Sequence, residues 1–72
     1  MNSTFEEFRN NVFCRRASNQ RKAHKLWGEI SKVMNDSDKT LFRTEWGHYM
    51  MGELDVDGFS LFFNKYVKKY YL

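Results

Sequence analysis

Aromatic residues are unusually frequent in this chain, and they recur at helical spacing. Phe, Tyr and Trp supply 13 of the 72 residues, whereas Val, Ile and Leu together supply 10. The core must therefore be built largely from aromatic side chains, each of which buries a large area. Hydrophobic residues make up 42% of the chain, which is too apolar for a disordered protein. A chain this short buries only about 60% of its unfolded surface, which leaves little room for an enclosed substrate cleft.

The spacing of the apolar residues predicts an all-α fold: a single compact bundle of three to four short helices with an aromatic-rich core, forming one domain over residues 1–72. There is no proline, and the four glycines are dispersed, so no linker is visible. The first helix is expected to begin at Ser3 or Thr4, because a glutamate three residues later can complete a capping box. A second helix is predicted from its cap at Ser18 to about Met34.

Two further helices are expected in the second half of the chain. The polar residues 35–38 form a turn that also offers caps for a third helix from about Thr40 to Glu53. Asp57 is the expected cap of a last helix that runs to the C-terminus. The residues assigned to the inward faces are Phe5, Phe8, Val12, Ala23, Leu26, Trp27, Ile30, Val33, Met34, Phe42, Trp46, Phe59, Phe62, Phe63 and Tyr66.

Basic residues are concentrated in the first half of the chain. Residues 1–34 carry seven basic and three acidic side chains, residues 35–57 carry two and six, and residues 58–72 carry three and none. On the predicted second helix, Arg21, Lys25 and Lys32 fall within about 40° of one another, with Gly28 on the same line. This face could track a phosphate backbone or could simply be a solvated helix face. The candidate nucleic-acid-binding residues are Arg15, Arg16, Arg21, Lys22, Lys25 and Lys32.

A second candidate surface comes from the aromatic residues and methionines that the core does not need. Tyr, Trp and Met are enriched at the centres of protein–protein interfaces. The candidate protein-binding residues are Tyr49, Met51, Tyr70 and Tyr71. The aromatic face of the last helix is expected to pack in the core, while its lysines suit the negative end of the helix dipole.

The sequence offers no recognisable catalytic or metal-binding motif. Cys14 is the single cysteine, so neither an intrachain disulfide nor a zinc pair is available, and we expect a reducing cytoplasm. His24 and His48 lack metal-ligand spacing, and Glu45 beside His48 is typical of a surface pair. We expect no enzyme activity and no cofactor. The N-terminal residues do not resemble an export signal, and no apolar segment approaches the roughly 20 residues of a membrane span.

The order of several aromatic motifs resembles a known family. Thr4-Phe5-x-x-Phe8, Ala23-His24-Lys25-Leu26-Trp27, Trp46-x-x-Tyr49-Met50 and Gly58-Phe59 leading to Tyr66 are similar to the pattern of the YozE family, short bacterial proteins with a SAM-like helical fold. The resemblance covers nearly the whole chain and implies a compact four-helix module without known catalysis; it assigns no site residues. The family's Phe-Pro turn is absent here. The size and aromatic richness also resemble a small phage or mobile-element accessory protein.

These observations together predict a non-enzymatic, cytoplasmic interaction module that binds a protein partner, as a phage or mobile-element modulator of a host factor. The alternative is a nucleic-acid-binding module that uses the basic face of the second helix. No membrane partner is expected, and the sequence leaves a homodimer open.

Overall fold

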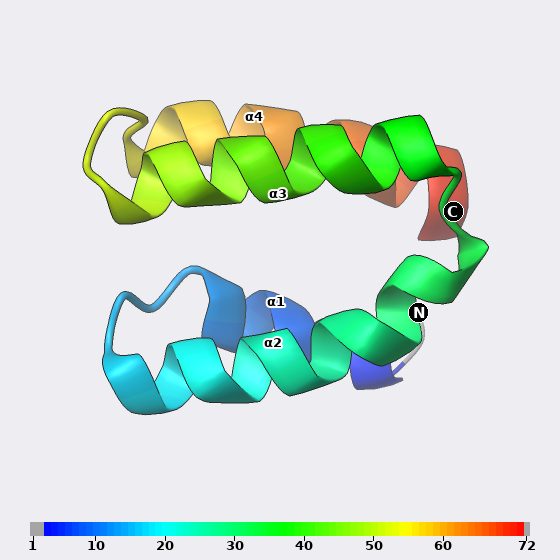
Figure 1. The fold of residues 1–72 in the computed structure, drawn as a ribbon, viewed down its shortest axis with the longest axis horizontal. Coiled ribbons are helices and arrows are strands. Elements are labelled where there is room, and N and C mark those ends of the chain that lie inside the picture. The colour runs from blue at the N-terminus through cyan, green and yellow to red at the C-terminus, as the bar shows by residue number, and fades with distance from the viewer. Residues whose placement is uncertain (1–2, 72) are drawn as a thin grey trace. The chain divides into compact units, whose positions relative to one another are not determined.

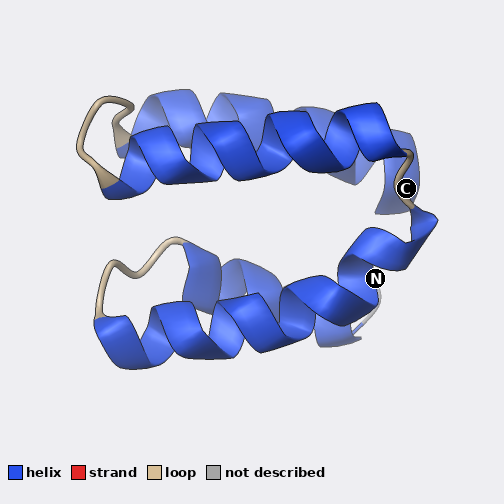
Figure 2. Ribbon diagram, viewed as in Figure 1, coloured by secondary structure: helices blue, strands red, loops and turns tan. Residues whose placement is uncertain are grey.

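The computed structural model describes residues 3–71, and these fold into helices joined by short turns without any strand (Figure 2). The chain divides into two compact units, residues 1–33 and 34–72, each containing a pair of adjacent helices (Figure 1). The all-α prediction is confirmed. The elements are α1 (Ser3–Val12), α2 (Ala17–Ile30), the 3₁₀ turn η1 (Ser31–Val33), α3 (Asp36–Met50), α4 (Val56–Tyr66) and the π-helical turn η2 (Val67–Tyr71).

In the first unit, α1 packs against α2 through the predicted apolar faces. Phe8 of α1 and Trp27 of α2 are buried, and their ring centroids lie 6.0 Å apart. Gln20 is buried beside them and donates from Nε2 to the carbonyls of Val12 at 3.0 Å and Cys14 at 2.7 Å. These carbonyls lie at and just beyond the end of α1, where no further helical turn could satisfy them. Gln20 therefore fixes the turn between α1 and α2.

Both ends of α2 differ from the prediction. The helix begins at Ala17 with Arg16 as its cap residue, and no side chain makes the capping hydrogen bond, so Ser18 is not the cap. Regular α-helix ends at Ile30, and the next three residues tighten into η1. This change of geometry takes Val33 off the buried face and leaves it 59% exposed. The core assignment of Val33 is therefore wrong.

In the second unit, both helices begin at a side-chain cap. The Asn35 Oδ1 accepts a hydrogen bond from the backbone N–H of Asp38 at 2.8 Å, so α3 begins at Asp36, earlier than the predicted Thr40. The Asp55 Oδ1 accepts one from the N–H of Gly58 at 2.7 Å. Asp55, rather than the predicted Asp57, therefore caps α4, because a cap side chain bonds an N–H two or three residues ahead.

The C-terminal end of α3 is a Schellman motif. Gly52 has φ +79°, and its N–H donates to the Tyr49 carbonyl at 3.2 Å. The N–H of Glu53 donates to the His48 carbonyl at 2.9 Å. This paired arrangement satisfies the last carbonyls of the helix and requires a residue in the left-handed region. The motif ends α3 at Met50, before the predicted Glu53.

The core of the second unit is an aromatic cluster around Phe42. The Phe42 ring is 1% exposed and lies with its centroid between 5.3 and 6.2 Å from five other rings. These rings belong to Trp46, Phe59, Phe62, Phe63 and Tyr66. Near the C-terminal end of α3, the Tyr49 ring stacks on the Phe59 ring, with 4.6 Å between the ring centroids and an interplanar angle of 17°. The aromatic residues thus hold α3 and α4 together, as expected from their number.

Replacing each of two glycines by alanine should change the free energy of unfolding in opposite directions, because only Gly52 belongs to the Schellman motif. Gly52→Ala should lower the free energy of unfolding by about 1–2 kcal/mol, because alanine is strained at positive φ. Gly47→Ala should raise it by about 0.5–1 kcal/mol, because Gly47 lies inside α3 with no heavy atom within 4 Å of an added Cβ. Urea unfolding followed by circular dichroism measures both. Equal effects at the two positions would contradict the assigned role of Gly52.

Candidate functional site

The predicted nucleic-acid-binding residues all lie in the first unit and are exposed. Arg15 and Arg16 lie in the turn before α2, and Arg21, Lys22 and Lys25 lie on α2 itself. Lys32 lies beyond the helix, in η1, and its Nζ pairs with Glu29 at 3.2 Å. Beside these residues, a Cβ added at Gly28 would meet nothing within 4 Å. Lys32 therefore does not continue a regular helical line from Arg21 and Lys25, which lie together with Lys22 on α2.

The predicted protein-binding residues are not brought together. Met51, at the C-terminal cap of α3, is 67% exposed, whereas Tyr70 and Tyr71 lie half-buried in η2. Tyr70 contacts Asp38 in the first turn of α3, so roughly 20 Å of helix separates it from Met51. Tyr49 is 1% exposed and stacks on Phe59. This corrects the expectation for Tyr49, which belongs to the core rather than to an exposed surface.

Tyr70 instead takes part in a polar cluster with Asp38 and Lys69. The Lys69 Nζ donates to Asp38 Oδ2 at 2.6 Å, and the Tyr70 hydroxyl donates to the same oxygen. The Lys69 ammonium also lies 5.4 Å from the centroid of the Tyr70 ring. The Asp38 side chain is only 17% exposed, while that of Lys69 is 55% exposed. The cluster ties η2 to the start of α3 across about 30 residues of sequence.

The protonation equilibria of the cluster follow from these contacts. The hydrogen bonds from Lys69 and Tyr70 hold the pKa of Asp38 below its ordinary value of 3.8. The hydrogen bond to Asp38 in turn raises the pKa of Lys69 above 10.5. Burial raises the pKa of the neighbouring Tyr66 above 10.0, with the negative charge of Asp38 acting in the same direction. At neutral pH Asp38 and Lys69 are therefore an ion pair, and the neighbouring Tyr66 is a neutral phenol.

A groove opens beside this cluster, between the first half of α3 and the second half of α4. We call it the Phe62 groove; its volume is about 240 Å³. The buried ring of Tyr66 forms part of its lining and contacts the half-buried Phe62 at 4.9 Å between centroids. Leu41 of α3 contributes an apolar side chain that is 48% exposed. The groove is lined by Asp38, Leu41, Phe62, Lys65, Tyr66 and Lys69.

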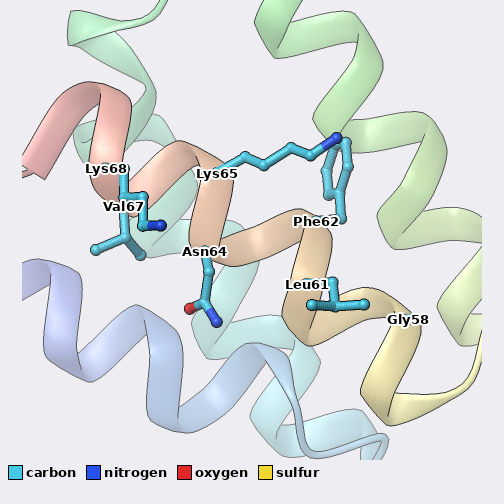
Figure 3. A pocket seen from close by; sticks show the side chains of 7 residues that line it. All are labelled: Gly58, Leu61, Phe62, Asn64, Lys65, Val67 and Lys68. Carbon is cyan, nitrogen blue, oxygen red and sulfur yellow. The ribbon is translucent and has the colours of Figure 1, made fainter.

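The apolar surface continues from the groove along α4. Phe62 and Lys65 also line a second, open hollow with Leu61, which is 72% exposed, and with Lys68 (Figure 3). In this view Phe62 and Lys65 extend from the same side of α4. The hollow is lined only by residues of α4 and η2, so it is the open face of one helix. We define the α3–α4 surface as Leu41, Leu61, Phe62, Lys65, Tyr66 and Lys68.

Sequence reasoning missed most of the α3–α4 surface. Tyr66 is buried as predicted, but Phe62, predicted for the core, is half-buried, and the sequence predicts no site role for Leu41 or Leu61. The available signal was Leu61, an apolar residue that lies on the lysine-bearing side of α4, away from Phe59 and Phe63. Such a residue marks an interaction site only where it is part of a contiguous exposed apolar patch.

The remaining reactive side chains that the structure describes include His48 and Cys14. His48 Nδ1 lies 3.7 Å from Glu45 Oε1, one turn earlier on the same helix, and both side chains are partly exposed. Cys14 is a half-buried free thiol in the turn after α1. Within residues 3–71 no three His, Cys, Asp or Glu side chains come close enough to hold a metal ion. Likewise, none of the described helices has the length and apolar character needed to cross a membrane.

Comparison of the chain with family models, with curated proteins and with solved structures finds no match. The resemblance to the YozE family therefore stays a prediction.

The Asp38 cluster predicts a specific loss of stability in acid. Because the pKa of Asp38 is lower in the folded protein than in the unfolded chain, its contribution to stability is present above about pH 4 and is lost as the pH falls through the folded-state pKa. Urea midpoints of wild type and Asp38→Asn should therefore differ at pH 7 and converge towards pH 2. Asp36→Asn is the control, because Asp36 is fully exposed and lies 4.0 Å from Lys39. Parallel curves for wild type and Asp38→Asn would contradict the cluster.

Proposed function

We propose that this protein is a non-enzymatic binding module that recognises a protein partner through the α3–α4 surface. One observation supports this most directly: Leu41 and Phe62 line one groove and Leu61 lines the adjoining hollow, so all three expose apolar area although the same unit has a well-packed aromatic core. Contiguous exposed apolar area around a groove is typical of interaction sites in small proteins.

The composition of the surface also favours a protein partner. An aromatic and aliphatic centre bordered by polar and charged side chains is the usual anatomy of a protein–protein interface. The buried Tyr66 ring contacts the Phe62 ring. Phe62 is therefore held in place before a partner binds, and it loses little conformational freedom on binding. At about 240 Å³ the Phe62 groove is smaller than the roughly 300–1,000 Å³ of small-molecule pockets. Side chains of a protein partner suit it better than a substrate.

We place this activity in the cytoplasm, because the single cysteine gives no disulfide framework. The small size and aromatic richness further support a role as a phage or mobile-element modulator of a host factor.

Site-specific photocrosslinking tests the protein-binding role. A photoreactive phenylalanine analogue at position 61 should give one stoichiometric protein adduct in a nuclease-treated lysate of the source cell. The added substitution Leu41→Ser should reduce its yield about tenfold, since truncating an interface-core residue costs more than about 1 kcal/mol. The same analogue at position 33, which is 59% exposed in the other unit, is the control. No adduct, or the same adduct from both positions, would contradict the proposal.

A second function is favoured by the exposure of the basic residues in the first unit. Residues 1–33 carry seven basic and three acidic side chains, and the six predicted contact residues are all exposed. On α2 the open space at Gly28 lies next to these cations. We propose nucleic-acid binding through α2 as the alternative function, with phosphate contact as its main interaction.

A salt titration with paired variants tests nucleic-acid binding. If α2 binds duplex DNA, the logarithm of the association constant should fall with the logarithm of salt concentration, with a slope of about −0.9 per neutralised phosphate. Arg21→Glu with Lys25→Glu should then abolish binding at about 50 mM salt and leave the circular dichroism spectrum unchanged. Lys65→Glu with Lys68→Glu makes the same charge change in the other unit and should retain binding. Equal losses in both variants would exclude a specific role for α2.

A further inference from the structure

The charged residues of α4 and η2 that line the groove and the hollow are all lysines. Lys65 and Lys68 are exposed and make no ion pair with the described residues. Residues 58–72 contain three lysines and no acidic side chain. The apolar centre of the surface is therefore flanked by two uncompensated positive charges.

The only carboxylate in the lining of the Phe62 groove does not offset these lysines. Asp38 is occupied by the ammonium of Lys69 and the hydroxyl of Tyr70, which both donate to its Oδ2. With Asp38 and Lys69 compensating each other, Lys65 and Lys68 are the remaining charged side chains in the lining of the groove and the hollow, while the Glu45 carboxylate of α3 also acts on Tyr66. A complementary partner must carry negative charge beside its apolar contacts.

The backbone of the unit also restricts the form of the partner segment. The described residues include no strand, so a peptide has no sheet edge to extend. A groove between two helices instead receives the side chains of an amphipathic helix, spaced at i, i+3 or i+4, and i+7. Leu41 lies on one side of the Phe62 groove and Phe62 on the other, and Leu61 extends the apolar area along α4.

We propose that the partner segment is an acidic amphipathic helix. Its apolar side chains enter the Phe62 groove and cover Leu61, and its flanking carboxylates pair with Lys65 and Lys68. This inference rests on the proposed protein-binding function and adds the chemical class of the partner.

A displayed peptide library tests this chemistry without knowledge of the natural partner. Peptides of about 16 residues, about four helical turns, carry large apolar residues at i, i+3, i+4 and i+7. Their flanking positions are drawn from Glu, Gln and Lys. Selection on the full-length protein should enrich Glu at the flanks. Counter-selection uses Leu41→Ser with Leu61→Ser, two exposed positions whose change leaves the core intact; the enriched peptides should not bind this variant.

The role of the lysines is then measured with one enriched peptide by fluorescence polarisation. Lys65→Gln with Lys68→Gln should weaken binding about three- to tenfold, as expected for the loss of two exposed ion pairs. The control variant, Lys22→Gln with Lys25→Gln, removes the same charge from α2 and should bind like wild type. Added salt should reduce the difference between wild type and the Lys65/Lys68 variant.

The outcomes separate the two proposals. Enrichment of Gln or Lys at the flanks, with binding that still requires Leu41 and Leu61, would overturn the acidic partner and leave the protein-binding surface in place. Enriched peptides that bind the Leu41→Ser, Leu61→Ser variant equally well, or no enrichment at all, would overturn both. Enrichment of Glu together with the loss of affinity in the Lys65/Lys68 variant would establish the partner chemistry.

Discussion

The packing of aromatic rings around Phe42 is the interaction on which the second unit depends. Phe42 belongs to α3, and four of the five rings around it come from α4, so one buried ring sets how the two helices meet. Aromatic pairs at these separations stabilise beyond the area they bury, and their preferred angles restrict how the helices can slide. The rings at the edge of this cluster, Phe62 and Tyr66, are also the rings that line the groove. The core and the candidate site therefore share the residues Phe62 and Tyr66.

The polar contacts of Asp38 hold the C-terminal residues of the chain beside the aromatic rings of the core. Asp38 lies in the first turn of α3, where a carboxylate already suits the helix dipole. Its contacts with Lys69 and Tyr70 hold the π-helical turn η2 against α3, and the Tyr70 ring stacks on Tyr66 at 6.2 Å. Tyr70 is thus half-buried rather than exposed. Tyr70 therefore has a structural role in this unit, and its part in a partner surface stays a prediction.

Some features of this fold depend only on residues close together in the sequence, and these features were predictable. Helix type and most core positions were predictable, because the spacing of residues such as Phe5, Phe8 and Trp27 depends only on neighbours within a few turns. The helix ends were less predictable, because several polar residues competed for each cap and hydrogen-bond geometry chose Asn35 and Asp55. The contact of Asp38 with Tyr70 spans 32 residues and follows from the packing of α3 on α4, so no local pattern contains it.

The three lysines near the C-terminus differ in whether a carboxylate pairs with them. Of the three lysines after residue 57, Lys69 is held by Asp38, whereas Lys65 and Lys68 have no carboxylate partner among residues 3–71. A set of solubilising charges would need no such division, because any exposed lysine serves that purpose. Here Lys69 is compensated by Asp38, and the two lysines beside Leu61 and Phe62 are not. In the second unit, two lysines without a carboxylate partner thus lie next to exposed apolar side chains, and the proposed protein-binding surface rests on this juxtaposition.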